Sequence, residues 1–273
     1  MEVYGLIGSP VDHSLSPVMF EAAFEERDID AVYATYHVES DDCLRALDGA
    51  TALGIDGLNV TIPHKETVLE WATPTEVADR IGAANVIDLS ADPPKADNTD
   101  AHAMTTVLSR LDQPPESALV VGAGGAAKAY VHALTEAGWE VTVANRTLER
   151  AQSLADRYES VSAIQLSQAS DSVPETTLIL NATPVGMQED VTPLSTDSIT
   201  AEHIVVDAVY RPVETRLLSA AATAGAQTVT GLTLLLEQGV ATFERWREED
   251  PPRRAMRVAL EEAIEALENP EVE

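Results

Sequence analysis

The sequence predicts an α/β protein of two domains, with a mostly parallel sheet in each. Short runs of β-branched residues alternate with amphipathic helical stretches along most of the chain. A glycine-rich turn joins a buried-type strand to a helix near the middle, at residues 118–138. A length of 273 residues with 45% apolar content is enough for two medium globular domains, each with its own core.

The first third of the chain contains the first set of alternating elements. A strand is expected at 3–8, and a helix at 16–28 with Ser16 as its N-cap and Pro17 at its first position. Further elements are expected in order: a strand at 31–38, a helix at 40–54 that ends at Gly54, a strand at 57–63, two short helical stretches, and a β-rich segment at 84–90. This alternation predicts parallel strands covered by helices.

A second set of elements follows a connecting helix at 101–111. Its strand-like runs lie within segments 117–125, 140–147, 176–187, 203–212 and 226–232, and the pattern is typical of a doubly wound nucleotide-binding domain. Two helices, 233–247 and 251–267, end the chain. One face of the last helix is apolar and is expected to pack on the first domain; it carries Met256, Leu260, Ile264 and Leu267. The expected domains are therefore residues 1–101 with 238–273, and residues 102–237.

Composition excludes several classes of protein. A net charge of −29 argues against nucleic acid as a partner, and this charge with only three lysines suggests adaptation to high salt. The single cysteine, Cys43, excludes an internal disulfide, and the six histidines have no metal-ligand spacing, so no metal is predicted. The N-terminus does not resemble a signal peptide, and no membrane span is predicted. A cytoplasmic enzyme is expected.

The glycine-rich turn matches the fingerprint of a dinucleotide-binding loop. Gly122, Gly124 and Ala127 satisfy G-x-G-x-x-G/A between a strand and a helix, and Gly138 ends that helix. Glycine permits a tight turn and close approach of the pyrophosphate, whose charge the helix N-terminus favours. The alternative is a glycine-rich turn that binds no ligand.

The end of the next strand distinguishes NADP from NAD. An NAD enzyme would carry Asp or Glu there for the ribose 2′-hydroxyl, whereas this chain has Asn145-Arg146-Thr147. The planar guanidinium of Arg146 can pair with a 2′-phosphate, so NADP is predicted. The alternative is a surface arginine that pairs with one of the many carboxylates.

A nicotinamide cofactor implies hydride transfer, which needs an acid/base group and groups that orient the substrate. Ser14 and Ser16 stand beside a helix N-terminus and suit a substrate carboxylate, although simple capping by Ser16 is the alternative. Other polar candidates in the first third are Thr61 and Lys65 after the third strand, Asn85 after IGAA, and Asp100 at the end of ADNTD.

Nine sequence blocks resemble the shikimate/quinate dehydrogenase family. In order they are GSPVDHSLSP, NVTIPHKE, IGAAN, DNTD, VVGAGGAAKA, NRTLERA, NATPVGM, VVDAVYRPVETRLL and GLTLLLEQGVATFERW. The resemblance implies that Lys65 is the catalytic acid/base and Asp100 its partner. Arginine cannot replace such a lysine, because a guanidinium does not lose its proton in proteins.

The resemblance also implies binding roles for the other matched residues. For substrate, Ser14 and Ser16 correspond to the carboxylate pair, and the ring hydroxyls fall to Thr61, Asn85, Asp100, Tyr210 and Gln238. For NADP, the implied residues are Gly122, Ala123, Gly124, Gly125, Ala126, Asn145, Arg146, Thr147 and Arg150, with Thr183, Ala208 and Gly231 on the nicotinamide side and Glu76 at a further cofactor position. Met19 and Val86 depart from the family pattern and leave the substrate geometry open.

The implied reaction is reversible reduction of 3-dehydroshikimate to shikimate with NADPH, in aromatic amino-acid biosynthesis. It would take place in a cleft between the domains, with no partner except small molecules. Three alternatives stay open: a quinate/shikimate dehydrogenase with broader substrate or cofactor use, a methylene-tetrahydrofolate dehydrogenase, and a ligand sensor without turnover. A homodimer is also left open by the sequence.

Overall fold

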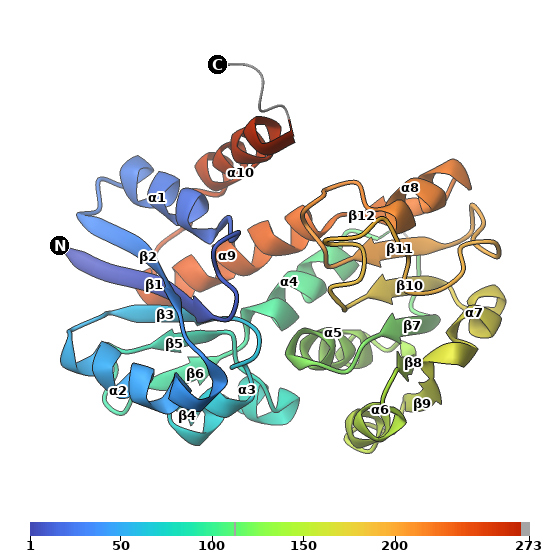
Figure 1. Ribbon diagram of the computed structural model, residues 1–273, viewed down its shortest axis with the longest axis horizontal. Helices are drawn as coiled ribbons and strands as arrows, with labels where there is room; N and C mark the ends of the chain where they lie inside the picture. Colours follow the sequence, from blue (N-terminus) through green and yellow to red (C-terminus); the bar gives the residue numbers. More distant parts are fainter. Residues whose placement is uncertain (112, 269–273) are drawn as a thin grey trace. The chain divides into compact units, whose positions relative to one another are not determined.

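The computed structural model describes residues 1–111 and 113–268. The chain divides into two compact units (Figure 1). Unit 1 comprises residues 1–103 and those from 236 onward, and unit 2 comprises residues 104–235. Both boundaries lie two residues from those expected, at 103 instead of 101 and at 236 instead of 238. Each unit has a mostly parallel sheet with helices around it, which confirms the predicted α/β class.

Unit 1 is built on a mixed sheet. Within the described residues the sheet has six strands in the order β2-β1-β3-β5-β6-β4. The strands are β1 (Glu2–Gly8), β2 (Ala31–His37), β3 (Gly57–Val60), β4 (Thr73–Pro74), β5 (Val86–Asp88) and β6 (Lys95–Asp97). β1 runs parallel to β2 and β3, whereas β5 is antiparallel to both β3 and β6. Thr61 directly follows β3 and Asn85 directly precedes β5, and because these strands are antiparallel the two residues lie at the same end of the pair.

Helices cover both faces of this sheet. They are α1 (Ser16–Glu26), α2 (Cys43–Ala52) and α3 (Glu76–Ile81), and a further helix of this unit, α10 (Arg253–Glu268), packs on α1. A short 3-10 turn at Ser40–Asp42 adjoins the start of α2, and another at Thr67–Glu70 follows the Lys65 segment. Two longer helices, α4 (Thr99–Leu108) and α9 (Gly231–Arg247), contain the residues at which the two units divide.

Six of the twelve Phe, Tyr and Trp residues of the chain cluster on one face of unit 1. Tyr4 stacks on Trp246 of α9 with ring centroids 4.6 Å apart, and Phe20 of α1 stacks on Tyr33 of β2 at 4.7 Å. Gly57 is needed beneath this cluster, because a Cβ there would lie 2.5 Å from the Trp246 ring nitrogen. The opposite face packs aliphatic residues against α2. Stacking of α1 and α9 against the sheet therefore fixes the position of both helices relative to β1–β3.

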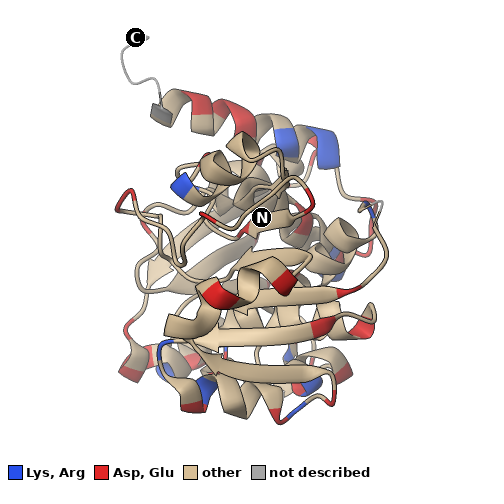
Figure 2. Cartoon of the chain, turned by 90° about the vertical axis from the view of Figure 1, so that its right-hand side faces the viewer, with Lys and Arg blue, Asp and Glu red and all other residues tan. Residues whose placement is uncertain are grey.

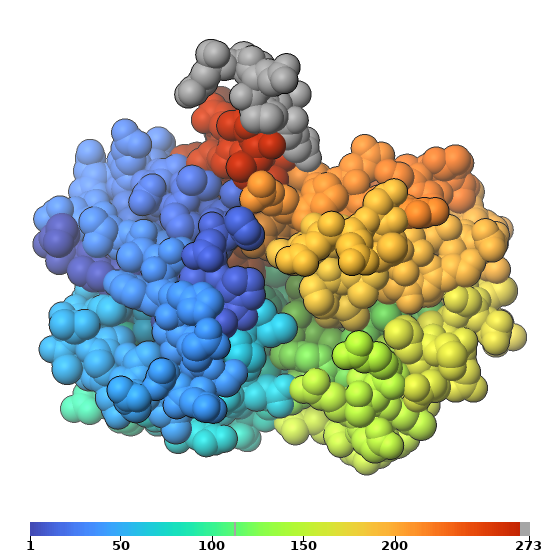
Figure 3. All heavy atoms as spheres, viewed as in Figure 1, coloured from blue at the N-terminus to red at the C-terminus, as the bar shows by residue number. Residues whose placement is uncertain are grey.

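The C-terminal helix α10 packs against α1, as the last helix was expected to pack on the first domain (Figures 1 and 3). Met256, Leu260 and Ile264 are buried there. Leu267 departs from the prediction, since 42% of its surface is exposed. The buried apolar face of α10 therefore ends one turn earlier than the spacing suggested.

Unit 2 has the topology of a doubly wound nucleotide-binding fold. Its described residues form a six-stranded parallel sheet in the order β12-β11-β10-β7-β8-β9. The strands are β7 (Ser117–Val121), β8 (Glu140–Asn145), β9 (Val161–Gln165), β10 (Leu178–Asn181), β11 (Ile204–Asp207) and β12 (Gln227–Val229). The helices are α5 (Gly125–Glu136), α6 (Leu148–Ala155), α7 (Ala169–Ser172) and α8 (Arg216–Thr223), with 3-10 turns at Leu166–Gln168 and Val173–Glu175.

Strand order reverses at β7 and β10, and this places the crevice of a doubly wound sheet at their carboxyl ends. Alternate residues of these strands, Leu119 and Ile179, pack with Leu217 and Leu218 of α8 in one core. The glycine-rich loop follows β7 directly. None of the helices in residues 1–111 and 113–268 has the length and apolar character needed to span a bilayer.

Candidate active site

Lys65 and Asp100 form an ion pair in unit 1. Lys65 Nζ lies 2.5 Å from Asp100 Oδ2, and the two side chains are 15% and 9% exposed. Asp100 sits in the first turn of α4, whereas Lys65 lies in the turn after β3. The two residues that the sequence suggested as acid/base and partner are therefore in direct contact. A pair so largely shielded from water is held more firmly than a surface ion pair.

Backbone hydrogen bonds hold the Lys65 segment in place. The Lys65 carbonyl accepts the Ala84 N–H at 2.7 Å, and the Thr61 N–H donates to the Ile7 carbonyl at 2.9 Å. The neighbouring His64 ring is buried, with Nε2 2.7 Å from the Val38 carbonyl. Both ends of the turn are thus tied to the sheet, so the lysine side chain projects from a fixed base.

Asn85 holds the second oxygen of Asp100. Its Nδ2 donates to Asp100 Oδ1 at 2.9 Å, while its Oδ1 accepts the backbone N–H of Thr99 at 2.7 Å. A backbone N–H can only donate, so the amide oxygen of Asn85 must face Thr99 and its NH₂ must face the carboxylate. One oxygen of Asp100 therefore accepts from the Lys65 ammonium and the other from the Asn85 amide.

Ser14 and Ser16 meet at the start of α1, where Ser14 Oγ accepts the Ser16 N–H at 3.2 Å. The prediction that Ser16 is the N-cap is wrong: the helix begins at Ser16, Leu15 is the N-cap, and Pro17 is the second helical residue. The N-cap Leu15 makes no side-chain hydrogen bond to the helix, so among the described residues Ser14 Oγ alone caps a first-turn N–H group, that of Ser16. This arrangement suits an anionic group such as a carboxylate.

The remaining unit 1 candidates lie on separate elements. Thr61 follows β3 and is half-buried, and Gln238 is largely buried on α9. Glu76, the suggested cofactor-side residue, is the first residue of α3, where the Thr75 side chain caps the helix by accepting the Ala78 N–H. A carboxylate in a first turn interacts favourably with the helix dipole, and the suggested cofactor role of Glu76 stays a prediction.

In unit 2 the glycine loop connects β7 to α5. Gly122 has φ +116°, and a Cβ there would lie 3.0 Å from the Ala182 carbonyl oxygen, so only glycine fits without strain. Gly124 is the N-cap of α5, makes no side-chain cap, and would have open space around a Cβ. Ala123, Gly125 and Ala126 complete the loop. Open space beside the free N–H groups of a twelve-residue helix fits a pyrophosphate.

The loop after β8 presents two exposed arginines. Arg146 and Arg150 form no ion pair with any described residue, so the alternative of a structural surface pair does not apply. Asn145 Nδ2 donates to the Thr147 carbonyl at 2.8 Å, and Gln165 Nε2 donates to the Arg146 carbonyl at 2.9 Å. The backbone of the loop is fixed while its guanidinium groups stay free, as recognition of a phosphate requires.

Sequence reasoning missed two residues that shape the loop after β10. Asn181 Oδ1 accepts from both the backbone N–H and the hydroxyl of Thr183, at 3.1 and 2.6 Å, and its Nδ2 donates to Asp207 Oδ1 at 2.9 Å. Asp207 is fully buried, and burial raises the pKa of its carboxyl, although hydrogen bonds from Thr215, Val209 and Asn181 oppose the shift. The sequence did contain a signal for both residues, because Asn181 and Asp207 are polar residues at the carboxyl ends of two strands of apolar sequence.

The other nicotinamide-side candidates follow β11 and begin α9. Ala208 and Tyr210 lie just after β11, with Tyr210 half-buried, and Gly231 is the first residue of α9. A Cβ at Gly231 would lie 2.4 Å from the Val209 carbonyl oxygen, so close packing of two backbones accounts for this glycine. Within unit 2 these residues, Thr183 and the glycine loop all lie at the carboxyl ends of strands.

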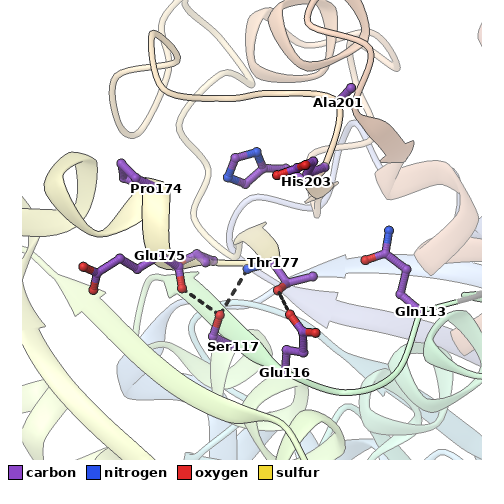
Figure 4. A pocket seen from close by; sticks show the side chains of 10 residues that line it. Gln113, Glu116, Ser117, Pro174, Glu175, Thr177, Ala201 and His203 are labelled. Atoms are coloured by element: carbon purple, nitrogen blue, oxygen red, sulfur yellow. Dashed lines mark hydrogen bonds between the residues drawn. The ribbon is translucent and has the colours of Figure 1, made fainter.

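A separate hollow of about 620 Å³ lies at the opposite edge of the unit 2 sheet, beside the amino ends of β7, β10 and β11 (Figure 4). Its polar groups pair with one another: Ser117 Oγ donates to the Glu175 carbonyl at 2.8 Å, and Thr177 Oγ1 donates to Glu116 Oε2 at 2.8 Å. Ligands of doubly wound sheets bind outside the carboxyl ends of the strands. This hollow is therefore not part of the candidate site.

Comparison with known proteins identifies the family of the chain. Three family models match successive parts of the chain: the shikimate dehydrogenase substrate binding domain at residues 6–87, shikimate/quinate 5-dehydrogenase at 106–223, and the shikimate 5′-dehydrogenase C-terminal domain at 231–261. The NADP(+) shikimate dehydrogenase of Haloarcula marismortui is 46% identical over 265 residues, which cover 97% of this chain and 100% of that protein.

Solved structures are similar over a comparable length. A crystal structure of a shikimate dehydrogenase in complex with NADP+ has a TM-score of 0.90 at 33% identity and covers 97% of this chain and 96% of its own. That of the Thermus thermophilus enzyme with NADP(H) and shikimate has a TM-score of 0.87 at 34% identity, with coverage of 96% and 100%. On these matches, the chain belongs to the shikimate dehydrogenase family.

Proposed function

We propose that this protein is an NADP-dependent shikimate dehydrogenase, which reversibly reduces 3-dehydroshikimate to shikimate in the pathway to aromatic amino acids. The observation that carries the proposal is the largely buried Lys65–Asp100 pair, held by Asn85, in a chain whose full-length relatives are NADP(+) shikimate dehydrogenases. The single cysteine, Cys43, is free and buried, which suits the reducing cytoplasm as the site of action.

Unit 2 would hold the cofactor. The α5 N-terminus with Gly124 takes the pyrophosphate, and Arg146 with Arg150 takes the 2′-phosphate. Thr183, in the loop organised by Asn181, with Ala208 and Gly231 lines the nicotinamide side. When bound, NADPH supplies the hydride.

Unit 1 would hold the substrate and move the proton. Ser14 and Ser16 bind the carboxylate, while Thr61, Asn85, Asp100 and Gln238 of unit 1, with Tyr210, bind ring hydroxyls. In the reducing direction the Lys65 ammonium donates a proton to the oxygen of the former carbonyl, and in the oxidising direction the neutral amine takes it back. Asp100 keeps Nζ at a fixed place throughout, since Asn85 anchors its other oxygen.

A spectrophotometric assay at 340 nm tests the proposal, with shikimate or quinate and NADP or NAD in the four combinations, across KCl concentrations. Turnover is expected to be highest with shikimate and NADP. Equal or higher kcat/KM with quinate, or with NAD, would instead identify a quinate/shikimate dehydrogenase of broader use. Binding of shikimate and NADPH without turnover in any combination would identify a sensor and refute the proposal.

A further inference from the structure

A chain of buried polar side chains continues from Asp100 and Asn85 to helix α9. Thr99 Oγ1 lies 3.0 Å from both Asn85 Nδ2 and Thr242 Oγ1, and Thr242 belongs to α9. Thr242 Oγ1 in turn accepts from Asn59 Nδ2 at 3.3 Å. Each of these residues as a whole is at most 6% exposed, and Thr242 is completely buried. Buried polar groups of this kind are costly unless each is hydrogen-bonded, so the chain has a definite arrangement of donors and acceptors.

The direction of each hydrogen bond can be assigned. Asn59 Nδ2 also donates to the Asn85 carbonyl at 3.3 Å, and Tyr33 Oη lies 2.9 Å from Asn59 Oδ1, so the Asn59 amide faces its NH₂ toward Thr242. The Thr242 hydroxyl accepts that hydrogen and is free to donate its own to Thr99. Each hydroxyl of the chain then acts once as a donor and at least once as an acceptor.

The next two bonds complete the chain. Thr99 Oγ1 accepts from Thr242 and from Asn85 Nδ2, so its own hydrogen goes to Asn85 Oδ1 at 3.2 Å. The second hydrogen of Asn85 Nδ2 goes to Asp100 Oδ1. The chain thus ends on Asp100 Oδ1, and the other carboxylate oxygen faces Lys65. Reversal of any one bond would leave a buried hydrogen without an acceptor.

We infer that Thr242 is a positioning residue for the acid/base pair, an inference that rests on the proposed role of Lys65 and Asp100. Its hydroxyl holds that of Thr99 in place, and the Thr99 hydroxyl, together with the Thr99 backbone N–H, bonds the Asn85 amide that holds Asp100. The residue touches neither Asp100 nor Lys65 and acts only through Thr99 and Asn85. Thr242 thus links the position of helix α9 within unit 1 to the position of the Lys65 side chain.

The test is a double-mutant cycle of Thr242→Val with Asp100→Asn, measured by steady-state kinetics with shikimate and NADP in molar KCl. Thr242→Val removes the hydroxyl at nearly constant volume. In the Asp100-containing enzyme kcat should fall roughly 3- to 10-fold, the effect of one lost hydrogen bond, with a smaller change in KM. In the Asp100→Asn enzyme the same substitution should change kcat less than about twofold, because the group that it positions is gone.

Two further variants separate positioning from general loss of stability. Thr242→Ser keeps the hydroxyl and should restore kcat, and Thr51→Val makes the same substitution on helix α2, outside the chain of hydrogen bonds, and should leave kcat unchanged. Thr242→Ala serves in place of Val if that variant does not fold, as judged by its thermal unfolding. An unchanged kcat in Thr242→Val, or an equal fall in both backgrounds, would overturn the inference. A normal kcat in Asp100→Asn alone would refute the proposed mechanism instead, and this inference with it.

Discussion

Small polar residues at the site act through the one hydrogen-bond direction that their surroundings permit. Asn85 is the example: the Thr99 N–H fixes its amide oxygen, so its NH₂ can only point to Asp100. An aspartate in its place would put a second carboxylate beside Asp100 and repel it. The identity of the residue is therefore set by donor and acceptor chemistry as much as by size.

At the same scale, Arg146 is expected to determine the choice of cofactor. Arg146→Ala removes an exposed guanidinium that has no ion-pair partner among the described residues. The protein without bound cofactor therefore loses no ion pair in this variant. The Kd for NADP should rise roughly 10- to 100-fold, since a hydrogen bond to a charged group contributes about 1.5–3 kcal/mol, whereas the Kd for NAD should hardly change. Titration calorimetry at one fixed KCl concentration measures both.

Arg254→Ala is the matched control for that change, because it removes another exposed positive charge, on α10 of unit 1. It should leave both dissociation constants as they are. Preference for NADP that survives in Arg146→Ala would show that another group recognises the 2′-phosphate.

Some residue-level features were predictable from the sequence, and others required the fold. Lys65 and Asp100 stood out because each closes a motif, although 35 positions separate them. Thr242 did not, because a threonine in an amphipathic helix resembles any other helix residue until its neighbours are known. The departure at Met19, which left the substrate geometry open, also needed the fold. Its side chain is completely buried beneath Gly239 of α9, where a Cβ would lie 2.2 Å from its terminal methyl.

At the scale of elements, most strands were predicted, including the edge strands β2 and β12, whereas β4, β6 and β9 were not. β7, β10 and β11 fall within the expected segments because their cores are continuous apolar runs, and β8 does so because it is rich in β-branched residues. β9 was missed: it is an edge strand whose sequence, VSAIQ, has no buried residue. β4 has two residues and β6 has three, which is too short for an alternation of apolar and polar residues to be recognised.

Helix α9 organises unit 1 through contacts that its sequence pattern does not reveal. Trp246 donates to the Ile87 carbonyl at 3.1 Å, Arg245 pairs with Asp97 at 2.5 Å, and Arg247 pairs with Glu2 of β1. The Glu2 carboxyl has a lowered pKa, chiefly because of its hydrogen bond from Arg247. Three successive residues thus tie the end of one helix to three strands, β5, β6 and β1, and α9 also carries Thr242 and Gln238.

At the scale of the whole molecule, the excess of acidic residues dominates. Carboxylates are spread over helices and loops with few basic residues between them (Figure 2), and the net charge is −29. Self-repulsion among like charges destabilises the folded state, and its reach falls from about 30 Å at 0.01 M salt to about 3 Å at 1 M. The protein is therefore expected to need high salt for full stability.

The midpoint of thermal unfolding should rise as KCl increases from 10 mM to molar concentrations, by about 2–4 °C for each 1 kcal/mol gained. Differential scanning calorimetry measures the midpoint. Sucrose is the control, because it stabilises by exclusion from the surface and screens no charge. Equal midpoints in dilute buffer and in molar KCl would remove the idea of salt adaptation.

The account as a whole depends on Lys65 as the group that transfers the proton, and Lys65→Ala tests it most directly. The measurement is kcat for oxidation of shikimate by NADP, with KM for shikimate and Kd for NADP, and Lys95→Ala is the control because Lys95 is an exposed lysine in β6 of the same unit. Loss of a general acid/base should lower kcat roughly 10²- to 10⁴-fold with little change in KM or Kd, and the control should behave as wild type. A kcat near that of wild type in Lys65→Ala would contradict the account.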